Sequence, residues 1–109
     1  MSHDVIHYEV INNEESKRFE IHVDGNVAFE DYDYFTTAQA EKGIAYLHTE
    51  VPPELGGRGI ASFLIKYILD YAEQQHLKVK PICPLVKAYI DKHPEYQANS
   101  VYHQPGSKQ

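Results

Sequence analysis

The sequence predicts a compact mixed α/β (α+β) fold, in which antiparallel strands come first and a strand–loop–helix–strand–helix unit follows. Three observations predict it. The first third of the chain contains short runs of β-branched and aromatic residues, a glycine-rich turn follows a later strand, and a helical stripe of apolar side chains comes directly after that turn. Because right-handed crossovers join parallel strands, the strands on either side of the helix should pair in parallel.

The opening strands are expected at 5–11, 18–23 and 27–34. The run at 18–23 alternates strictly between apolar and polar residues, which is typical of a strand with one buried face. Asp24-Gly25-Asn26 is a turn signal between the second and third strands. The sequence therefore predicts an antiparallel hairpin.

The second half of the chain should form the crossover unit. A strand at 44–51 leads into the glycine-rich loop, and apolar residues at three- and four-residue spacing predict a helix over 60–75. A short strand at 77–82 and a second helix at 85–90, bounded by prolines, complete the unit. The tail 98–109 is polar and is expected to fray.

Composition limits the possible functions. The 109 residues predict a single domain, 1–109, with a core at about 5–97, and a content of 42% hydrophobic and 24% charged residues is typical of globular proteins. The net charge of −6 argues against a nucleic-acid surface. The chain has one cysteine, no signal-peptide pattern and no apolar run of roughly 18–20 residues, so we expect a cytoplasmic protein without membrane contact.

The most informative stretch runs from Val51 to Ala61, with the sequence VPPELGGRGIA. Glycine lets the backbone approach a ligand closely, and a helix start offers unpaired N–H groups and the positive end of the helix dipole. Together these features favour an anion site, most naturally for phosphate. The dinucleotide pattern G-x-G-x-x-G and the nucleoside-triphosphate pattern G-x-x-x-x-G-K-[ST] are both missing, and an ordinary connecting loop is the alternative interpretation.

This loop resembles the pyrophosphate loop of the GCN5-related N-acetyltransferases, whose pattern is [QR]-x-x-G-x-[GA] followed by a helix. Gly59 and Ala61 match the last two defined positions, whereas Gly56 stands where the family usually has Gln or Arg. The resemblance implies that acetyl-coenzyme A is the cofactor and that backbone N–H groups of the loop bind its diphosphate. Those groups belong to Gly56, Gly57, Arg58, Gly59, Ile60 and Ala61.

The flanking segments are similar to one branch of that superfamily. They read His48-Thr49-Glu50-Val51-Pro52-Pro53-Glu54 before the loop, and Lys80-Pro81-Ile82-Cys83-Pro84 and Tyr89 to Tyr96 after it. The branch consists of short, single-domain proteins and includes the bacterial YidJ-type group and a small plant acetyltransferase. The resemblance covers about 19–96, which is most of the chain.

The resemblance also implies where the reaction occurs. The thioester would lie where the strand at 44–51 diverges from the strand at 77–82, and Tyr89 would border the thiol. The Arg58 side chain either adds charge at the diphosphate or lies in solvent. Backbone N–H groups would polarise the thioester carbonyl, and they belong to Thr49, Glu50 and Val51.

Cys83 and His48 are the candidate catalytic residues. Cys83 lies just before a helix start, where the helix dipole favours a thiolate, although a lone cysteine is also a common buried apolar residue. His48 shares a strand face with Glu50 and could act as a base near neutral pH, yet the chain has seven histidines and a surface role is the alternative. The histidine spacing does not fit a zinc site, so no metal is expected.

We therefore expect an acetyl-coenzyme A-binding N-acetyltransferase-like protein that transfers an acetyl group to an amine acceptor, directly or through Cys83. One alternative is a non-catalytic coenzyme A-binding or interaction module, which the glycine at Gly56 favours. A second alternative is a purely structural domain. We expect a monomer or a weak dimer.

Overall fold

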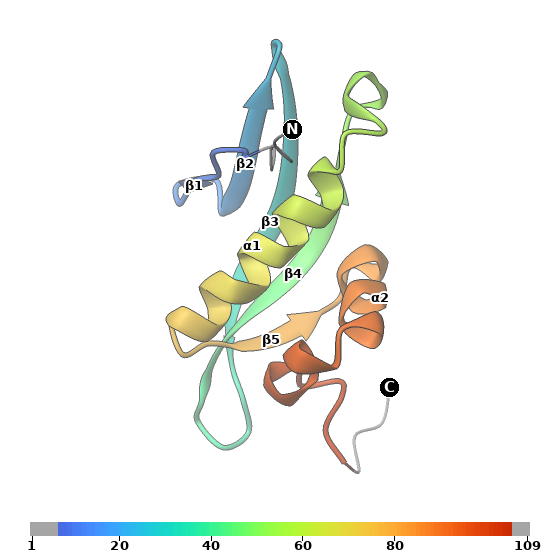
Figure 1. Cartoon of the computed structure of the whole chain (residues 1–109). Helices are drawn as coiled ribbons and strands as arrows, with labels where there is room; N and C mark the ends of the chain where they lie inside the picture. Colours follow the sequence, from blue (N-terminus) through green and yellow to red (C-terminus); the bar gives the residue numbers. More distant parts are fainter. Residues whose placement is uncertain (1–6, 106–109) are drawn as a thin grey trace.

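The computed structural model describes residues 7–105 and contains one five-stranded sheet with the order β1-β2-β3-β4-β5 (Figure 1). The pairs β1–β2, β2–β3 and β3–β4 are antiparallel, and β5 runs parallel to β4. Both pairing modes agree with the sequence-based prediction. The strands are β1 (Ile11–Asn13), β2 (Arg18–Val23), β3 (Asn26–Thr36), β4 (Lys42–Glu50) and β5 (Lys78–Pro81).

Two α-helices and two short 3-10 helices complete the fold. Helix α1 (Ile60–Gln74) crosses one face of the sheet, and α2 (Pro84–Lys92) follows β5 at the side of the molecule (Figure 1). The 3-10 helices are η1 (Pro53–Leu55), before α1, and η2 (Pro94–Asn99), after α2. The predicted strand–loop–helix–strand–helix order is confirmed. Among residues 7–105 there is no helix of the length and apolarity that a membrane span needs.

The core lies between α1 and the sheet, because the two patterns read from the sequence meet there. Phe19 and Ile21 point inward from alternate positions of β2, and Leu64 and Ile68 point inward from α1. The hydroxyl of Tyr46, on β4, donates to the carbonyl oxygen of Ile68 at 2.6 Å. This buried bond fixes α1 over the centre of the sheet and contributes about 1 kcal/mol.

The β2–β3 hairpin has the tight turn that the sequence predicts. Asp24 and Gly25 form the two-residue loop and both have positive φ, 51° and 79°. Positive φ at both positions defines a type I′ turn, whose twist matches that of the flanking strands. The turn therefore fixes the register in which Val23 pairs with Asn26.

Two expectations about the ends of the sheet differ from the structure. The first strand was expected at 5–11, but among its described residues only Ile11 is in a strand. Residues 7–10 instead pass beside α1, where the Tyr8 ring packs edge-on against Phe63 with centroids 5.4 Å apart. Because of this aromatic contact, residues 7–10 do not pair with the edge of the sheet. Residues 5 and 6 of the expected strand lie outside the described part of the protein.

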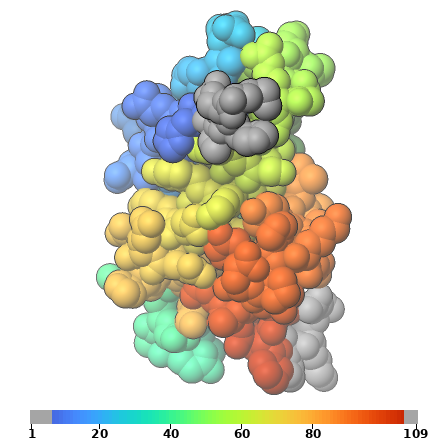
Figure 2. Space-filling model, in the orientation of Figure 1, coloured from blue at the N-terminus to red at the C-terminus, as the bar shows by residue number. Residues whose placement is uncertain are grey.

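The segment expected to fray from Ala98 is tied to β5 over its first residues. Ser100 is fully buried and forms a parallel bridge with Val79, and the N–H of Val101 donates to the Val79 carbonyl at 2.9 Å. The polar composition of the tail misled the prediction because hydrogen bonds rather than apolar contacts hold this segment; the Asn99 side chain, for example, donates to the Leu77 carbonyl at 2.7 Å. Figure 2 shows the α2 and η2 residues, orange to red, packed beside the yellow residues of α1.

Candidate functional site

The parallel strands β4 and β5 separate halfway along β4. β5 pairs only with residues 43–46, and the last backbone contact between the two segments is the N–H of Cys83 donating to the Tyr46 carbonyl at 2.9 Å. β4 continues to Glu50, so no described strand pairs with that edge of its last four residues. We call this divergence, between residues 47–50 and Cys83, the fork.

A bulge in β4 lies at the fork. Asp31 pairs with His48 while the next residue of β3, Tyr32, pairs with Tyr46, so Leu47 is the extra residue of β4. A bulge bends and twists its strand, which turns the end of β4 away from β5. β5 ends at Pro81, which has no N–H to extend the parallel ladder.

On the helix-facing side of the fork, three polar side chains form a buried chain. The hydroxyl of Thr49 donates to Oε1 of Glu30, its register partner on β3. The same hydroxyl oxygen lies 3.1 Å from Sγ of Cys83. Glu30 is 0% exposed, Cys83 3% and Thr49 7%. We call these three residues the Glu30–Thr49–Cys83 chain.

Glu30 has the most perturbed carboxyl group of the described residues. Burial raises its pKa from 4.5 to about 8, although the hydrogen bond from Thr49 opposes the rise. Its second oxygen, Oε2, is buried and has no hydrogen-bond partner among residues 7–105. A buried carboxyl group with a displaced pKa beside a cysteine is the kind of cluster found at functional sites.

His48 lies on the face of the sheet opposite to the Glu30–Thr49–Cys83 chain. Its Nε2 is 2.9 Å from Oε1 of Glu50, and the two side chains are 59% and 51% exposed. The expected sharing of one face by His48 and Glu50 is confirmed, because alternate strand residues point the same way. Their neighbour Thr49 points the opposite way, toward Cys83. The two predicted catalytic residues, His48 and Cys83, therefore lie on opposite faces of the sheet at the fork.

The glycine-rich loop leads from η1 into α1 with an open surface. Gly57 and Gly59 have φ of 78° and 73°, and a Cβ atom at either position would meet no atom within 4 Å. These left-handed conformations favour glycine. The helix starts at Ile60, and its first N–H groups have no acceptor among the described residues until Phe63 donates to Gly59. They belong to Ile60, Ala61 and Ser62.

Gly56 is the residue that follows η1. Its N–H donates to the Pro53 carbonyl at 3.0 Å and closes η1. In this structure that N–H is already paired, and the role of Gly56 at the diphosphate stays a prediction. The proline-rich segment before the loop forms a 3-10 turn, and the N–H of Gly56 is used in the hydrogen bond that closes this turn.

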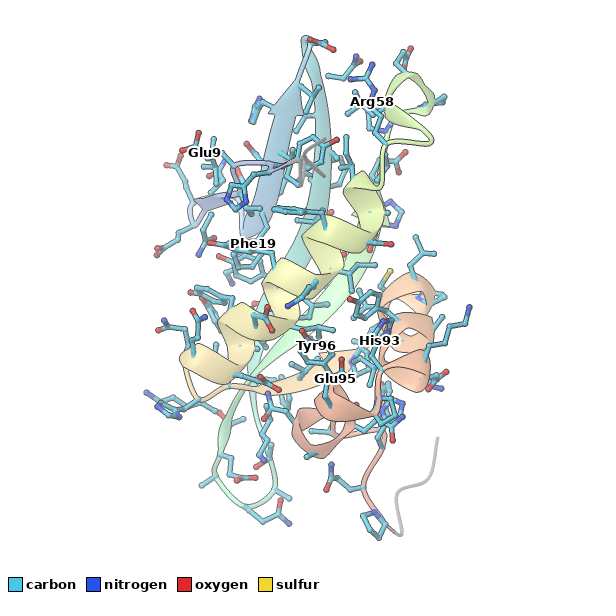
Figure 3. All side chains as sticks on the ribbon, in the orientation of Figure 1. Glu9, Phe19, Arg58, His93, Glu95 and Tyr96 are labelled. Carbon is cyan, nitrogen blue, oxygen red and sulfur yellow. The ribbon has the colours of Figure 1, made fainter. Side chains whose placement is uncertain are left out.

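Arg58 is held at the tip of the β2–β3 hairpin. Its guanidinium lies 3.1 Å from a carboxylate oxygen of Asp24, and its carbonyl accepts a hydrogen bond from the Tyr8 hydroxyl at 3.2 Å (Figure 3). Both charged side chains are largely exposed, so the pair is weak. The loop is thus anchored to the hairpin by Arg58, a role that the sequence did not indicate.

A groove of about 410 Å³ runs between α1 and α2 and reaches the first turn of α1. The ring of Tyr89 stacks on His93 with centroids 3.8 Å apart, and His93 Nδ1 donates to the Tyr89 carbonyl at 2.7 Å. Figure 3 labels His93 at the end of α2. The groove is lined from α1 by Ala61, Ser62 and Ile65, and from α2 by Leu85, Tyr89 and Lys92.

Sequence reasoning missed Glu30 and Lys92. Glu30 occupies an inward position of β3 between Ala28 and Tyr32, and an acidic residue in an inward apolar series was the available signal. Lys92, in the last turn of α2, carried no such signal. No group of three or more potential metal ligands occurs within residues 7–105.

The comparisons with known proteins agree with this geometry. A family model described as GCN5-related N-acetyl-transferase matches residues 18–99, which include the whole fork. The chain belongs to the GCN5-related N-acetyltransferase family. The mixed α/β fold with its five-stranded sheet is therefore that of a GCN5-related N-acetyltransferase domain.

Curated relatives of this family match part of the chain. It is 35% identical over 54 residues to Protein NATD1 of Xenopus tropicalis, an alignment that covers 50% of each protein. It is 40% identical over 47 residues to Protein NATD1 of Gallus gallus, covering 43% of each, and to that of Homo sapiens, covering 43% of this chain and 42% of the relative. The chain thus spans about half the length, or less, of the curated relatives it matches.

Proposed function

We propose that this protein binds acetyl-coenzyme A at the fork and transfers its acetyl group to an amine. The observation that carries the proposal is the position of the fork beside the unpaired N–H groups that begin α1. A strand edge without a partner can bind an extended ligand, and a helix start can bind its diphosphate. Membership of the acetyltransferase family supports both assignments.

In this proposal, the cofactor lies on the helix-facing side of the sheet. Its diphosphate contacts the N–H groups of Ile60, Ala61 and Ser62, whose positive dipole end favours an anion. The rest of the nucleotide follows the α1–α2 groove, where Lys92 supplies a positive charge.

The pantetheine arm bonds to the free edge of β4 near Thr49, Glu50 and Val51, which brings the thioester close to Cys83.

The amine acceptor approaches from the opposite face, where His48 and Glu50 are exposed. In direct transfer, the amine nitrogen would bond to the acetyl carbon, the carbon–sulfur bond would break with its electron pair leaving on the coenzyme A thiolate, and His48 would take the proton from nitrogen. Glu50 orients the imidazole of His48 through their 2.9 Å contact. In the alternative route, the Cys83 thiolate would take the acetyl group and release the coenzyme A thiolate, and the amine would then take the acetyl group and release the Cys83 thiolate.

Calorimetric titration with coenzyme A tests the binding step. Gly59→Ala places a methyl group where the loop faces the proposed diphosphate and should weaken binding at least about tenfold, the cost of roughly 1.4 kcal/mol of lost contact. Gly25→Ala is the matched control, because Gly25 has a similar φ of 79° and equally open surroundings but lies in the β2–β3 turn and not in the loop itself. Equal affinities for the two variants would reject the proposed cradle.

Acetyl transfer to a panel of amines tests the chemistry. His48→Ala should reduce turnover by about two orders of magnitude if His48 is the base. His22→Ala is the control, since His22 contacts Glu20 at the same 2.9 Å on β2, away from the fork. Binding of coenzyme A without transfer to any amine would instead indicate a non-catalytic binding module.

A further inference from the structure

The proposed chemistry leaves the buried carboxyl group of Glu30 without a role. It lies in the sheet beneath the fork, fully buried, and Oε2 has no partner among the described residues. An ionisable group is seldom buried without a function, because burial without full hydrogen bonding costs several kcal/mol. Its one side-chain hydrogen bond leads through Thr49 to Cys83, which is the single thiol of the chain.

We propose that Glu30 is a positioning residue that accepts the proton of the Cys83 thiol, with the Thr49 hydroxyl carrying the proton between them. The thiol donates its proton to Oγ1 of Thr49 while the Thr49 hydroxyl donates its own proton to Oε1 of Glu30. The thiol becomes a thiolate and the carboxylate becomes a carboxylic acid, so proton and charge balance. The transfer makes the sulfur nucleophilic only while Glu30 is ionised.

The surroundings of Glu30 suit this role. Burial raises its pKa to about 8, so the ionised Glu30 carboxylate is a stronger base than an ordinary carboxylate. The other titratable groups that act on Glu30 are Asp31, next on β3, and Tyr46 on β4. Neither of them is hydrogen-bonded to Glu30, so Thr49 provides the only side-chain route for its proton within residues 7–105.

The inference extends the proposed function, because it rests on Cys83 lying where the thioester would be held. Its test needs no coenzyme A, so its failure can be distinguished from failure of cofactor binding. The reaction is alkylation of Cys83 by iodoacetamide, in which the sulfur–carbon bond forms, iodide leaves, and the thiol proton passes to Glu30. The rate is measured across the neutral to alkaline pH range with folded protein.

The wild-type rate should rise with pH and bend near pH 8, where Glu30 loses its proton. Glu30→Gln should remove the bend and lower the rate at that pH by about a hundredfold, the low end of what a positioned base contributes. Thr49→Val, which keeps the shape but lacks the hydroxyl, should behave like Glu30→Gln. Thr49→Ser keeps the hydroxyl and should restore the wild-type profile.

A purely structural role for Thr49 would not separate serine from valine in this way. If Thr49→Val keeps the wild-type bend, the relay is wrong.

A second measurement does not depend on access of a reagent to the buried sulfur. The carboxyl carbon of Glu30 is titrated by NMR in the wild type, in Cys83→Ala and in Thr49→Val. Coupled groups lose their protons in steps that belong to the pair, so both variants should change the Glu30 titration curve. Identical curves in all three proteins would overturn the proposal.

Discussion

The buried carboxyl group of Glu30 should make the stability of the whole protein depend on pH. Its pKa is raised by burial from 4.5 to about 8. Between pH 4.5 and about pH 8, Glu30 keeps its proton in the folded protein and has lost it in the unfolded protein. The native state therefore binds more protons than the unfolded state, and its free energy of unfolding falls as pH rises. The stability linked to Glu30 is complete below about pH 4.5 and is lost on approaching pH 8.

The magnitude follows from the same two values. Each pH unit between them corresponds to about 1.4 kcal/mol, so the full interval amounts to about 5 kcal/mol. Glu30→Gln replaces the carboxyl group with a neutral amide of the same shape and removes this proton uptake. The variant should gain stability relative to the wild type by about 1.4 kcal/mol per pH unit from pH 5 to pH 7.5.

Urea unfolding of both proteins at several pH values measures this difference directly. Asp33→Asn is the control on the same strand, because the hydrogen bond from Lys17 lowers the pKa of Asp33 and confines its linked stability change to acidic pH. The difference in free energy of unfolding between Asp33→Asn and the wild type should stay constant above pH 5. If the difference in free energy of unfolding between Glu30→Gln and the wild type also stays constant, then Glu30 titrates normally. That result would refute the claim that burial raises its pKa.

Three further substitutions test other parts of the structure. Lys92→Gln should weaken coenzyme A binding by about tenfold in a salt-dependent manner, whereas Lys87→Gln, on the same helix, should leave it unchanged. Gly43→Ala should cost about 1–3 kcal/mol in urea unfolding, because its Cβ would lie 2.3 Å from the Phe35 ring and 3.0 Å from the Lys78 carbonyl oxygen. A Phe35→Ala background should remove most of that cost, and an equal cost in both backgrounds would contradict the explanation. Tyr46→Phe should cost about 1 kcal/mol by losing its buried hydrogen bond, and an unchanged urea midpoint would contradict this.

Local patterns predicted the fold well wherever a single period or turn governs the backbone. The alternation in β2, the Asp24-Gly25 turn and the apolar stripe of α1 each appear where the sequence placed them. Expectations were wrong where a distant contact decided the outcome. Tyr8 was expected in the first strand but packs on Phe63 of α1 instead, and no residue near Tyr8 in the sequence could have indicated that contact.

The sequence indicated several residues of the candidate site but not how their side chains are arranged. Cys83 and His48 both lie at the fork, because β4 and β5 pair in parallel and separate after Tyr46, and the glycine-rich loop follows the end of β4. The sequence could not show that His48 and Cys83 occupy opposite faces, since this depends on side-chain direction around a bulge in β4. Glu30 is distant in sequence from Cys83, and only the β3–β4 register joins them through Thr49.

Titration of isotope-labelled protein with coenzyme A, followed by amide NMR, tests the central claim most directly. We expect the largest shifts at the start of α1, at Ile60, Ala61 and Ser62, and at the fork, at Thr49 and Cys83. A larger cavity of about 520 Å³ lies at the other end of the sheet, between the β3–β4 loop, β5 and the segment after η2. Shifts confined to that cavity, or no shifts at all, would contradict the assignment of the fork as the cofactor site.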